Sequence, residues 1–137
     1  MSARILIAED HPASLELMSY LLRAHGYDIL PAENGEIALA LAHSERPDLI
    51  LCDLQMPAKT GFEVAEAVKS DPRTKDIPLI AVTAFSMLGD REKVLAAGFD
   101  DYFSKPIDAT CFVRDLEQHL PPSLLATRLP RATRNGT

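Results

Sequence analysis

The chain has 137 residues, of which 47% are hydrophobic and 25% are charged, and it carries a formal net charge of −6. This length is typical of a single domain, and the composition is that of an ordinary globular protein. The excess of acidic residues argues against a direct nucleic-acid partner, because phosphate backbones are bound through lysine and arginine.

The sequence also argues against a membrane segment or a secretory leader. Its apolar runs are too short to span a bilayer, and the first of them ends at Glu9 and Asp10, which makes it too short and too acidic for a signal peptide. Cys52 and Cys111 lack the closely spaced ligands of a zinc site, so we interpret them as reduced thiols packed as small hydrophobic groups. We therefore expect a cytoplasmic protein without a membrane partner.

Five short β-rich runs alternate along the chain with segments whose apolar residues recur at helical spacing, as Leu15, Met18 and Leu22 do. Such alternation predicts an α/β fold of five β-α units, with a parallel sheet covered by helices on both faces. The strands are expected at residues 4–8, 27–32, 49–53, 78–83 and 101–104.

The composition of the runs indicates the position of each strand in the sheet. Runs 5–8, 49–52 and 79–82 are continuously apolar, as expected for central strands buried on both faces. The run that contains Asp28 and Pro31 suits an edge, because proline cannot donate a ladder hydrogen bond.

Residues that favour helix ends separate the predicted elements. Pro12 suits the first turn of a helix, and Asn34 and Asp108 are candidate N-caps. Gly26 and Gly98 follow helical segments, where a glycine commonly ends a helix. The spacing of these residues agrees with the five predicted β-α units.

Polar residues follow four of the five strands, and the carboxyl ends of parallel strands meet at one edge of the sheet. Glu9 and Asp10 follow the first strand, Asp53 and Thr83 end the third and fourth, and Lys105 follows the fifth. One lysine neutralises only part of the charge of three carboxylates, so a hard divalent cation is expected there. Mg²⁺ prefers such oxygen ligands.

This set of residues also suggests a reaction. A carboxylate such as Asp53 can attack phosphorus and form an aspartyl phosphate, and this transfer depends on positioning and charge stabilisation. Mg²⁺, Lys105 and the Thr83 hydroxyl could each contact a phosphoryl oxygen. The turn after the first strand has no glycine to cradle a phosphate, which argues against a dinucleotide site. His11 is either a metal ligand, a phosphohistidine or, more simply, a loop residue at a helix start.

The order and spacing of these motifs resemble those of the receiver domain of two-component response regulators, in particular single-domain, chemotaxis-regulator-like receivers. The resemblance covers roughly residues 3–120 and implies a flavodoxin-like sheet with the strand order 2-1-3-4-5. The matching positions are Glu9-Asp10, Asp53 within "DLQMP", Gly61, Thr83-Ala84 and Lys105-Pro106.

The resemblance implies that Asp53 accepts a phosphoryl group from a phosphohistidine on a sensor histidine kinase or a phosphotransfer protein. It implies a Mg²⁺ site formed by Asp10, Asp53 and the backbone carbonyl of Gln55, with Glu9 acting through water. Residues Gln55 and Phe85 would affect the access of water to the acyl phosphate.

The resemblance further implies that Lys105 pairs with the phosphoryl group, and that its bond to Pro106 is cis. Thr83 would move to hydrogen-bond the phosphoryl group, and Tyr102 would change rotamer with it. The surface that changes would be the face around the fourth helix, fifth strand and fifth helix, at about residues 84–120. A downstream protein target would bind there. If the chain forms a homodimer, the fourth and fifth helices are the expected interface.

Two other function classes match these residues less well. An aspartate-nucleophile phosphohydrolase of the haloacid-dehalogenase type needs a second acid two residues after the first, but Gln55 stands there. A degenerate receiver that binds partners without phosphorylation would be expected to lack Asp53, Lys105 or the acid pair. We expect residues 1–120 to form the receiver and 121–137 a flexible tail with three arginines, and we favour a stand-alone protein over the excised receiver of a hybrid kinase.

Overall fold

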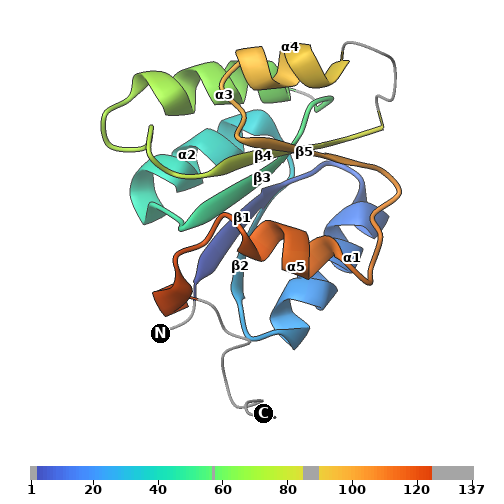
Figure 1. Cartoon of the computed structure of the whole chain (residues 1–137). Helices are drawn as coiled ribbons and strands as arrows, with labels where there is room; N and C mark the ends of the chain where they lie inside the picture. The colour runs from blue at the N-terminus through green and yellow to red at the C-terminus, as the bar shows by residue number, and fades with distance from the viewer. Residues whose placement is uncertain (1–2, 57, 85–89, 125–137) are drawn as a thin grey trace.

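The computed structural model describes residues 3–56, 58–84 and 90–124 of the chain. Strands and helices alternate from the N-terminus (Figure 1). The strands are β1 (Arg4–Ala8), β2 (Asp28–Ala32), β3 (Leu49–Asp53), β4 (Leu79–Thr83) and β5 (Asp101–Ser104). The helices are α1 (Pro12–Ala24), α2 (Gly35–Glu45), α3 (Gly61–Ser70), α4 (Asp90–Ala96) and α5 (Phe112–Glu117), followed by the 3₁₀ turn η1 (Pro122–Leu124).

The strands form one parallel sheet in the order β2-β1-β3-β4-β5, which confirms the predicted fold and strand order. All residues of β3 and β4 are buried, as their continuously apolar sequences predict for central strands. The β2 strand, with the exposed Asp28 and Pro31, lies at an edge of the sheet. A proline is tolerated there because an edge strand needs fewer ladder donors.

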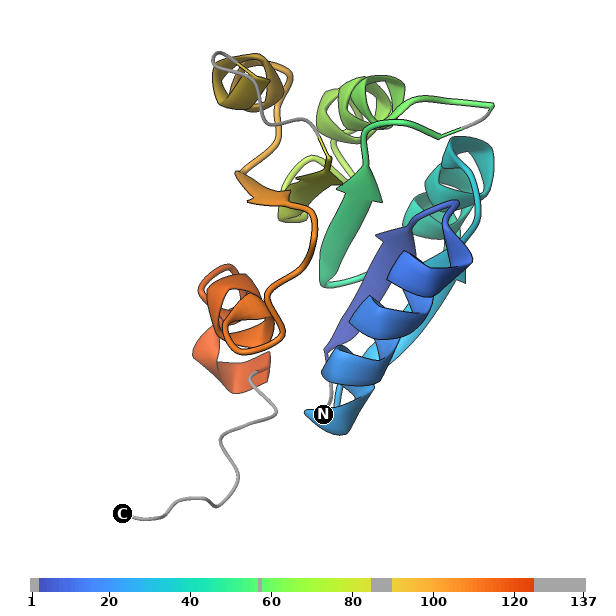
Figure 2. The same cartoon turned by 90° about the vertical axis from the view of Figure 1, so that its right-hand side faces the viewer.

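Two hydrophobic clusters cover the two faces of the sheet. Above the sheet in Figure 1, α2, α3 and α4 contribute residues such as Ala38, Val68 and Val94 to the first cluster. On the other face, α1 and α5 contribute residues such as Leu22 and Leu116 to the second. Figure 2 shows the twisted sheet between these two helical layers. This three-layer packing holds the carboxyl ends of the strands at one edge.

Most of the predicted helix boundaries are confirmed. Pro12 begins α1, and the side chain of Asn34 accepts a hydrogen bond from the Ile37 amide at the start of α2. Gly26 and Gly98 follow helices with φ values of 93° and 112°, which L-residues with a side chain rarely adopt.

The prediction that Asp108 is the N-cap of the last helix is wrong, because α5 begins at Phe112 with Cys111 as its N-cap. The Asp108 carboxylate instead accepts hydrogen bonds from the amide and hydroxyl of Thr110. This local turn satisfies the aspartate before the helix starts, as Asp side chains commonly do in turns.

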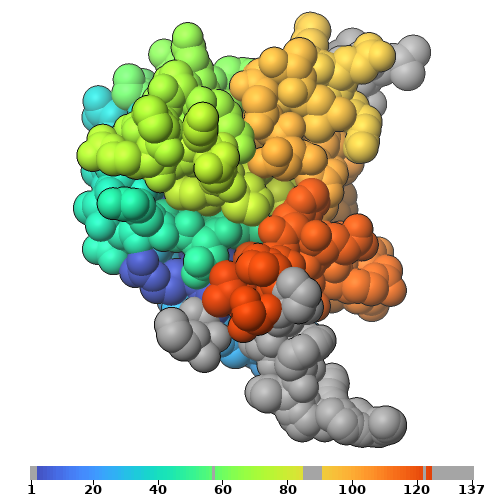
Figure 3. All heavy atoms as spheres, turned by 60° about the vertical axis from the view of Figure 1, so that its left-hand side comes forward, coloured from blue at the N-terminus to red at the C-terminus, as the bar shows by residue number. Residues whose placement is uncertain are grey.

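Two half-buried histidines form side-chain hydrogen bonds to carboxylates of other elements. The Nε2 atom of His43, on α2, lies 2.9 Å from Asp71 at the end of α3, and Nε2 of His119, after α5, lies 2.8 Å from Asp101 at the start of β5. These contacts therefore tie helix ends to neighbouring elements. Figure 3 shows the α3 and α4 segments side by side on one face of the molecule.

The beginning of the predicted tail has local structure. The side chain of Leu124, in η1, packs against the second hydrophobic cluster, while residues 125–137 lie outside the described residues. Among the described helices, none is both long enough and apolar enough to span a membrane.

Candidate phosphoacceptor and metal site

Asp53 lies at the carboxyl end of the central strand β3, with only 4% of its surface exposed. Its Oδ2 atom lies 3.2 Å from Nζ of Lys105, and its Oδ1 atom accepts a 3.1 Å hydrogen bond from the backbone amide of Gln55. Each carboxylate oxygen therefore has a donor, which offsets part of the cost of burying the charge.

Glu9 lies beside Asp53 and is more deeply buried, with 1% of its surface exposed. Its Oε2 atom accepts a 3.1 Å hydrogen bond from the amide of His11. Its Oε1 atom forms an ion pair with Lys105 at 2.9 Å, but no described residue donates a hydrogen bond to that oxygen. Burial and the nearby Asp53 carboxylate raise the pKa of Glu9, and the contact with Lys105 offsets this only in part.

Lys105 joins the two buried carboxylates from the end of β5. Burial alone would lower the pKa of its ammonium, but the contact with Glu9 and the charge of Asp53 outweigh this effect and raise the pKa. The lysine therefore stays charged at neutral pH. One ammonium facing Glu9, Asp53 and the adjacent Asp10 leaves the site with excess negative charge.

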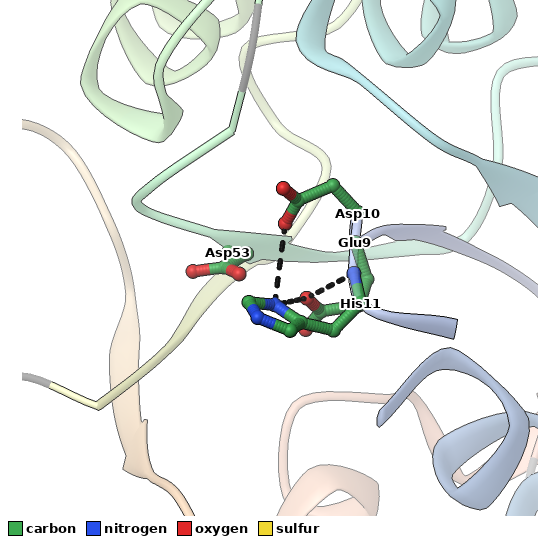
Figure 4. A group of neighbouring side chains, drawn as sticks. All are labelled: Glu9, Asp10, His11 and Asp53. Carbon is green, nitrogen blue, oxygen red and sulfur yellow. Dashed lines mark hydrogen bonds and ion pairs between the residues drawn. The ribbon is translucent and has the colours of Figure 1, made fainter. Parts of the chain in front are cut away.

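Four side chains could hold a metal ion at this edge. One ligand atom from each of Glu9, Asp10, His11 and Asp53 lies within 4.8 Å of the others, and Figure 4 shows these side chains gathered around one point. The donor set is rich in carboxylate oxygens, and the buried Oε1 of Glu9 receives no hydrogen bond from the described residues. These residues fit a hard divalent cation such as Mg²⁺.

The sequence-predicted residues Thr83, Tyr102 and Gln55 occupy different places around the cluster. Thr83 is buried at the end of β4, next to the end of β3. Tyr102 lies within β5, opposite Ala81 of β4, and its ring is half-buried against the first hydrophobic cluster rather than among the carboxylates. Gln55 has an exposed side chain, and its backbone contacts Asp53.

Two further features bear on the sequence-based expectations. The Lys105-Pro106 bond is cis, as the resemblance implies. Phe85, expected to affect the access of water, lies outside the described residues. His11 precedes α1 as its N-cap residue, as the preferred interpretation expects, and a nitrogen of its ring also lies among the ligand atoms of the cluster. The position of His11 directly after Asp10 was the available signal.

The two cysteines do not supply thiolate chemistry to the site. Burial, with the neighbouring charge of Asp53, raises the pKa of Cys52 far above its usual range. The contact with Asp108, followed by burial, also raises the pKa of Cys111. Both thiols are free and stay protonated at neutral pH. The chemistry of this edge therefore does not depend on the thiols.

Comparisons with known proteins agree with this geometry. The family model of the response regulator receiver domain matches residues 5–117. The polar-differentiation response regulator DivK of Brucella anthropi is 41% identical over 120 residues, which cover 88% of this chain and 98% of that protein.

Solved structures are similar as well. The chemotaxis response regulator CheY4 of Vibrio cholerae superposes with a TM-score of 0.82 at 28% identity, over 88% of this chain and all of that one. The receiver domain of a sensor histidine kinase from Pseudomonas aeruginosa has a TM-score of 0.79 and is 31% identical, over 86% of this chain and 97% of that one. That crystal structure has a magnesium ion coordinated in its active-site cleft.

Proposed function

Because the chain belongs to the response regulator receiver family, which serves two-component signal transduction rather than classical enzymatic turnover, we propose that it accepts a phosphoryl group on Asp53. The donor is a phosphohistidine on a sensor histidine kinase or a phosphotransfer protein. The reaction depends on Mg²⁺, and the only catalysis is of the chain's own phosphorylation and slow dephosphorylation. The phosphorylated form signals through protein–protein contacts.

The observation that carries this proposal is the contact between Asp53 and Lys105. The acceptor carboxylate lies at the end of a buried central strand, and the ammonium reaches it at 3.2 Å from a strand end 52 residues further along the chain. The ammonium also contacts Glu9 at 2.9 Å. A positive charge beside the acceptor stabilises the charge that develops on the transferred phosphoryl group.

Asp10, Asp53 and the backbone carbonyl of Gln55 would hold the magnesium ion, with Glu9 supporting it through water. When bound, the ion neutralises phosphoryl oxygens and helps to orient the phosphoryl group. The support for this assignment is the convergence of carboxylate oxygens within 4.8 Å and the magnesium ion in the similar receiver from Pseudomonas aeruginosa.

The proposed transfer is an in-line displacement at phosphorus. A carboxylate oxygen of Asp53 forms the new bond to phosphorus while the bond from phosphorus to the donor imidazole nitrogen breaks. The electron pair of that bond stays on the imidazole, so no external oxidant or reductant is needed. Lys105 contacts one phosphoryl oxygen, and the Thr83 hydroxyl donates a hydrogen bond to another, which favours the phosphorylated conformation.

The conformational signal is proposed to pass from Thr83 to Tyr102 and then to the face formed by α4, β5 and α5. The Tyr102 side chain, on β5, is half-buried against the first hydrophobic cluster. On α4, Leu95 is an exposed hydrophobic residue. A downstream protein would bind this face when the chain is phosphorylated. A homodimer would form through the same face.

We further propose that residues 1–120 form the receiver, that residues 121–137 form a tail whose first turn, η1, packs against the receiver through Leu124, and that the protein is cytoplasmic. The family match at residues 5–117 supports the first boundary. The two free cysteines fit a reducing compartment.

Intact mass spectrometry of the full chain tests the proposal. Incubation with acetyl phosphate and Mg²⁺ should add one phosphate to the wild type and to Asp76→Asn, which removes an exposed carboxylate from the α3–β4 loop. Asp53→Asn and a magnesium-free sample should show no adduct. The proposal is wrong if no adduct forms with acetyl phosphate or with a phosphohistidine donor, or if Asp53→Asn is modified as fully as the wild type.

A further inference from the structure

The imidazole of His11 brings a nitrogen atom into the acidic cluster. Its Nδ1 atom lies 3.4 Å from Oε2 of Glu9 and 3.5 Å from Oδ1 of Asp10 (Figure 4). Ionised carboxylates only accept, so Nδ1 either carries a hydrogen that points at these oxygens or shares a metal ion with them. The cluster is therefore a mixed nitrogen and oxygen site.

The two contact distances fit ligands of one metal ion. With bonds of about 2.0–2.2 Å, adjacent ligand atoms of a tetrahedral or octahedral ion lie roughly 2.8–3.6 Å apart, and opposite ones in an octahedron about 4.0–4.4 Å. The spread of the four ligand atoms is at most 4.8 Å, so only a small contraction is needed. The side chains of His11 and Asp10 are 69% and 31% exposed and are free to make it.

Lys105 and His11 contact different oxygen atoms of the acidic cluster. The ammonium contacts Oε1 of Glu9 and Oδ2 of Asp53, whereas the imidazole contacts Oε2 of Glu9 and Oδ1 of Asp10. Buried Glu9 thus offers one oxygen to each, and its Oε1 atom still lacks a hydrogen bond from the described residues. This carboxylate has acceptor capacity for a metal ion in addition to the ammonium.

We propose that His11 is a metal ligand that shifts this site towards transition-metal dications such as Zn²⁺. The inference rests on the metal site of the proposed function, but not on phosphoryl transfer. Mg²⁺ gains little from an imidazole, because it prefers oxygen ligands and dehydrates reluctantly. Imidazole suits zinc and nickel, and binding affinity rises along the divalent series towards them. The ring therefore raises zinc affinity more than magnesium affinity.

Calorimetric titration of the full chain with Zn²⁺, and separately with Mg²⁺, gives the ratio of the two affinities. His11→Asn removes the ring nitrogen but keeps a polar side chain at the start of α1. Loss of an outer-shell partner of a metal ligand already costs about 10–100-fold in affinity, so loss of the ligand itself should lower the zinc-to-magnesium ratio at least tenfold. His25→Asn is the matched control, because His25 is exposed at the end of α1 and its ring contacts the Leu21 carbonyl. It should keep the wild-type ratio.

Nuclear magnetic resonance of the histidine rings identifies the ligand directly. The His11 ring signals, assigned by their loss in His11→Asn, should shift with one equivalent of Zn²⁺ and return when excess Mg²⁺ competes. An equal affinity ratio in wild type and His11→Asn, or a His11 ring that zinc leaves unchanged, would overturn the inference and leave His11 as a polar neighbour of the carboxylates.

The phosphorylation assay with Mg²⁺ on the same preparations separates this inference from the proposed function. A phosphate adduct on Asp53 together with an unchanged affinity ratio would refute only the metal role of His11. A changed ratio without any adduct would refute only the phosphoacceptor function.

Discussion

The backbone amide of Lys105 donates a 2.8 Å hydrogen bond to the carbonyl of Thr83. This bond continues the pairing of β4 with β5, in which Thr83 lies opposite Ser104. The two side chains proposed to contact the phosphoryl group therefore start from one hydrogen-bonded pair of strand ends. A shift of β5 relative to β4 would change the positions of both, and Tyr102 lies on the same strand.

Gly61 should be required for the position of Asp53. A Cβ atom at Gly61 would lie 2.5 Å from the carbonyl oxygen of Asp53 and 2.7 Å from Cα of Leu54. Both are backbone atoms, so the β3–α3 connection would have to move. We expect Gly61→Ala to lower the free energy of unfolding by about 1–3 kcal/mol, as overpacking does, and to weaken Mg²⁺ binding.

Urea denaturation and magnesium titration check this prediction. Glu66→Ala, at an exposed position of the same helix, should change the free energy of unfolding by less than about 0.5 kcal/mol. If Gly61→Ala matched this control in both measurements, the close approach of α3 to the end of β3 would have no role in forming the site.

Glu9 should make the metal-free chain less stable as the pH rises. Burial, followed by the proximity of Asp53, raises the pKa of Glu9 above its ordinary value of 4.5. Between 4.5 and the raised value, the folded chain binds more protons than the unfolded chain does. The free energy of unfolding therefore falls as pH rises through this window and levels off above it.

Urea denaturation in the presence of a chelator, at several pH values from 4.5 upwards, measures this dependence. Glu9→Gln keeps the shape of the side chain and removes its titration, so its stability should fall less with pH than that of the wild type. Glu66→Gln, at an exposed position, should follow the wild type. Parallel curves for Glu9→Gln and the wild type would contradict the prediction.

Sequence reasoning succeeded where a residue's role depends on its own strand. The apolar runs of β3 and β4 predict burial on both faces, and Pro31 predicts an edge. Because parallel strands end at one edge, the residues after each strand also predicted the meeting of Asp53 with Glu9 and Lys105. These inferences need only the order of elements along the chain.

Sequence reasoning failed where a side chain's role depends on distant or competing partners. His43 and Asp71 are 28 residues apart, and only the packing of α2 on α3 brings them together. Asp108 has the right residue type for an N-cap, but the nearby Thr110 competes for its carboxylate. The orientation of the His11 ring towards Glu9 likewise depends on how the chain turns into α1.

Mg²⁺ should stabilise the chain through Asp10. Binding to the folded state alone adds about 2.7 kcal/mol to the free energy of unfolding when the ion is at 100 times its Kd. Asp10→Asn removes a ligand and also one repelling charge, so this variant should be more stable than the wild type without metal but gain little from Mg²⁺. Thermal melts at increasing Mg²⁺, with Asp76→Asn as the control, measure both effects. Equal magnesium-induced shifts in Asp10→Asn and the wild type would exclude Asp10 as a ligand.

The Thr83 hydroxyl should couple phosphorylation to Tyr102. Thr83 is buried at the end of β4, and Thr83→Val keeps its branched shape while removing the hydroxyl. We expect acetyl phosphate and Mg²⁺ to change the Tyr102 ring signals in nuclear magnetic resonance spectra of the wild type. In Thr83→Val, intact mass should still show an adduct on Asp53, but most of the Tyr102 change should be lost.

Internal and matched controls make this last experiment specific. Tyr20, which is 70% exposed on α1, lies on the other face of the sheet from the first hydrophobic cluster and should not respond to phosphorylation. Thr110→Val removes an exposed hydroxyl that contacts Asp108 and should keep the full Tyr102 response. A full response of Tyr102 in phosphorylated Thr83→Val would break the proposed link between the two residues, because the signal would then reach β5 without the hydroxyl. Lys105, whose amide is bonded to the Thr83 carbonyl, would then be the better candidate for carrying it.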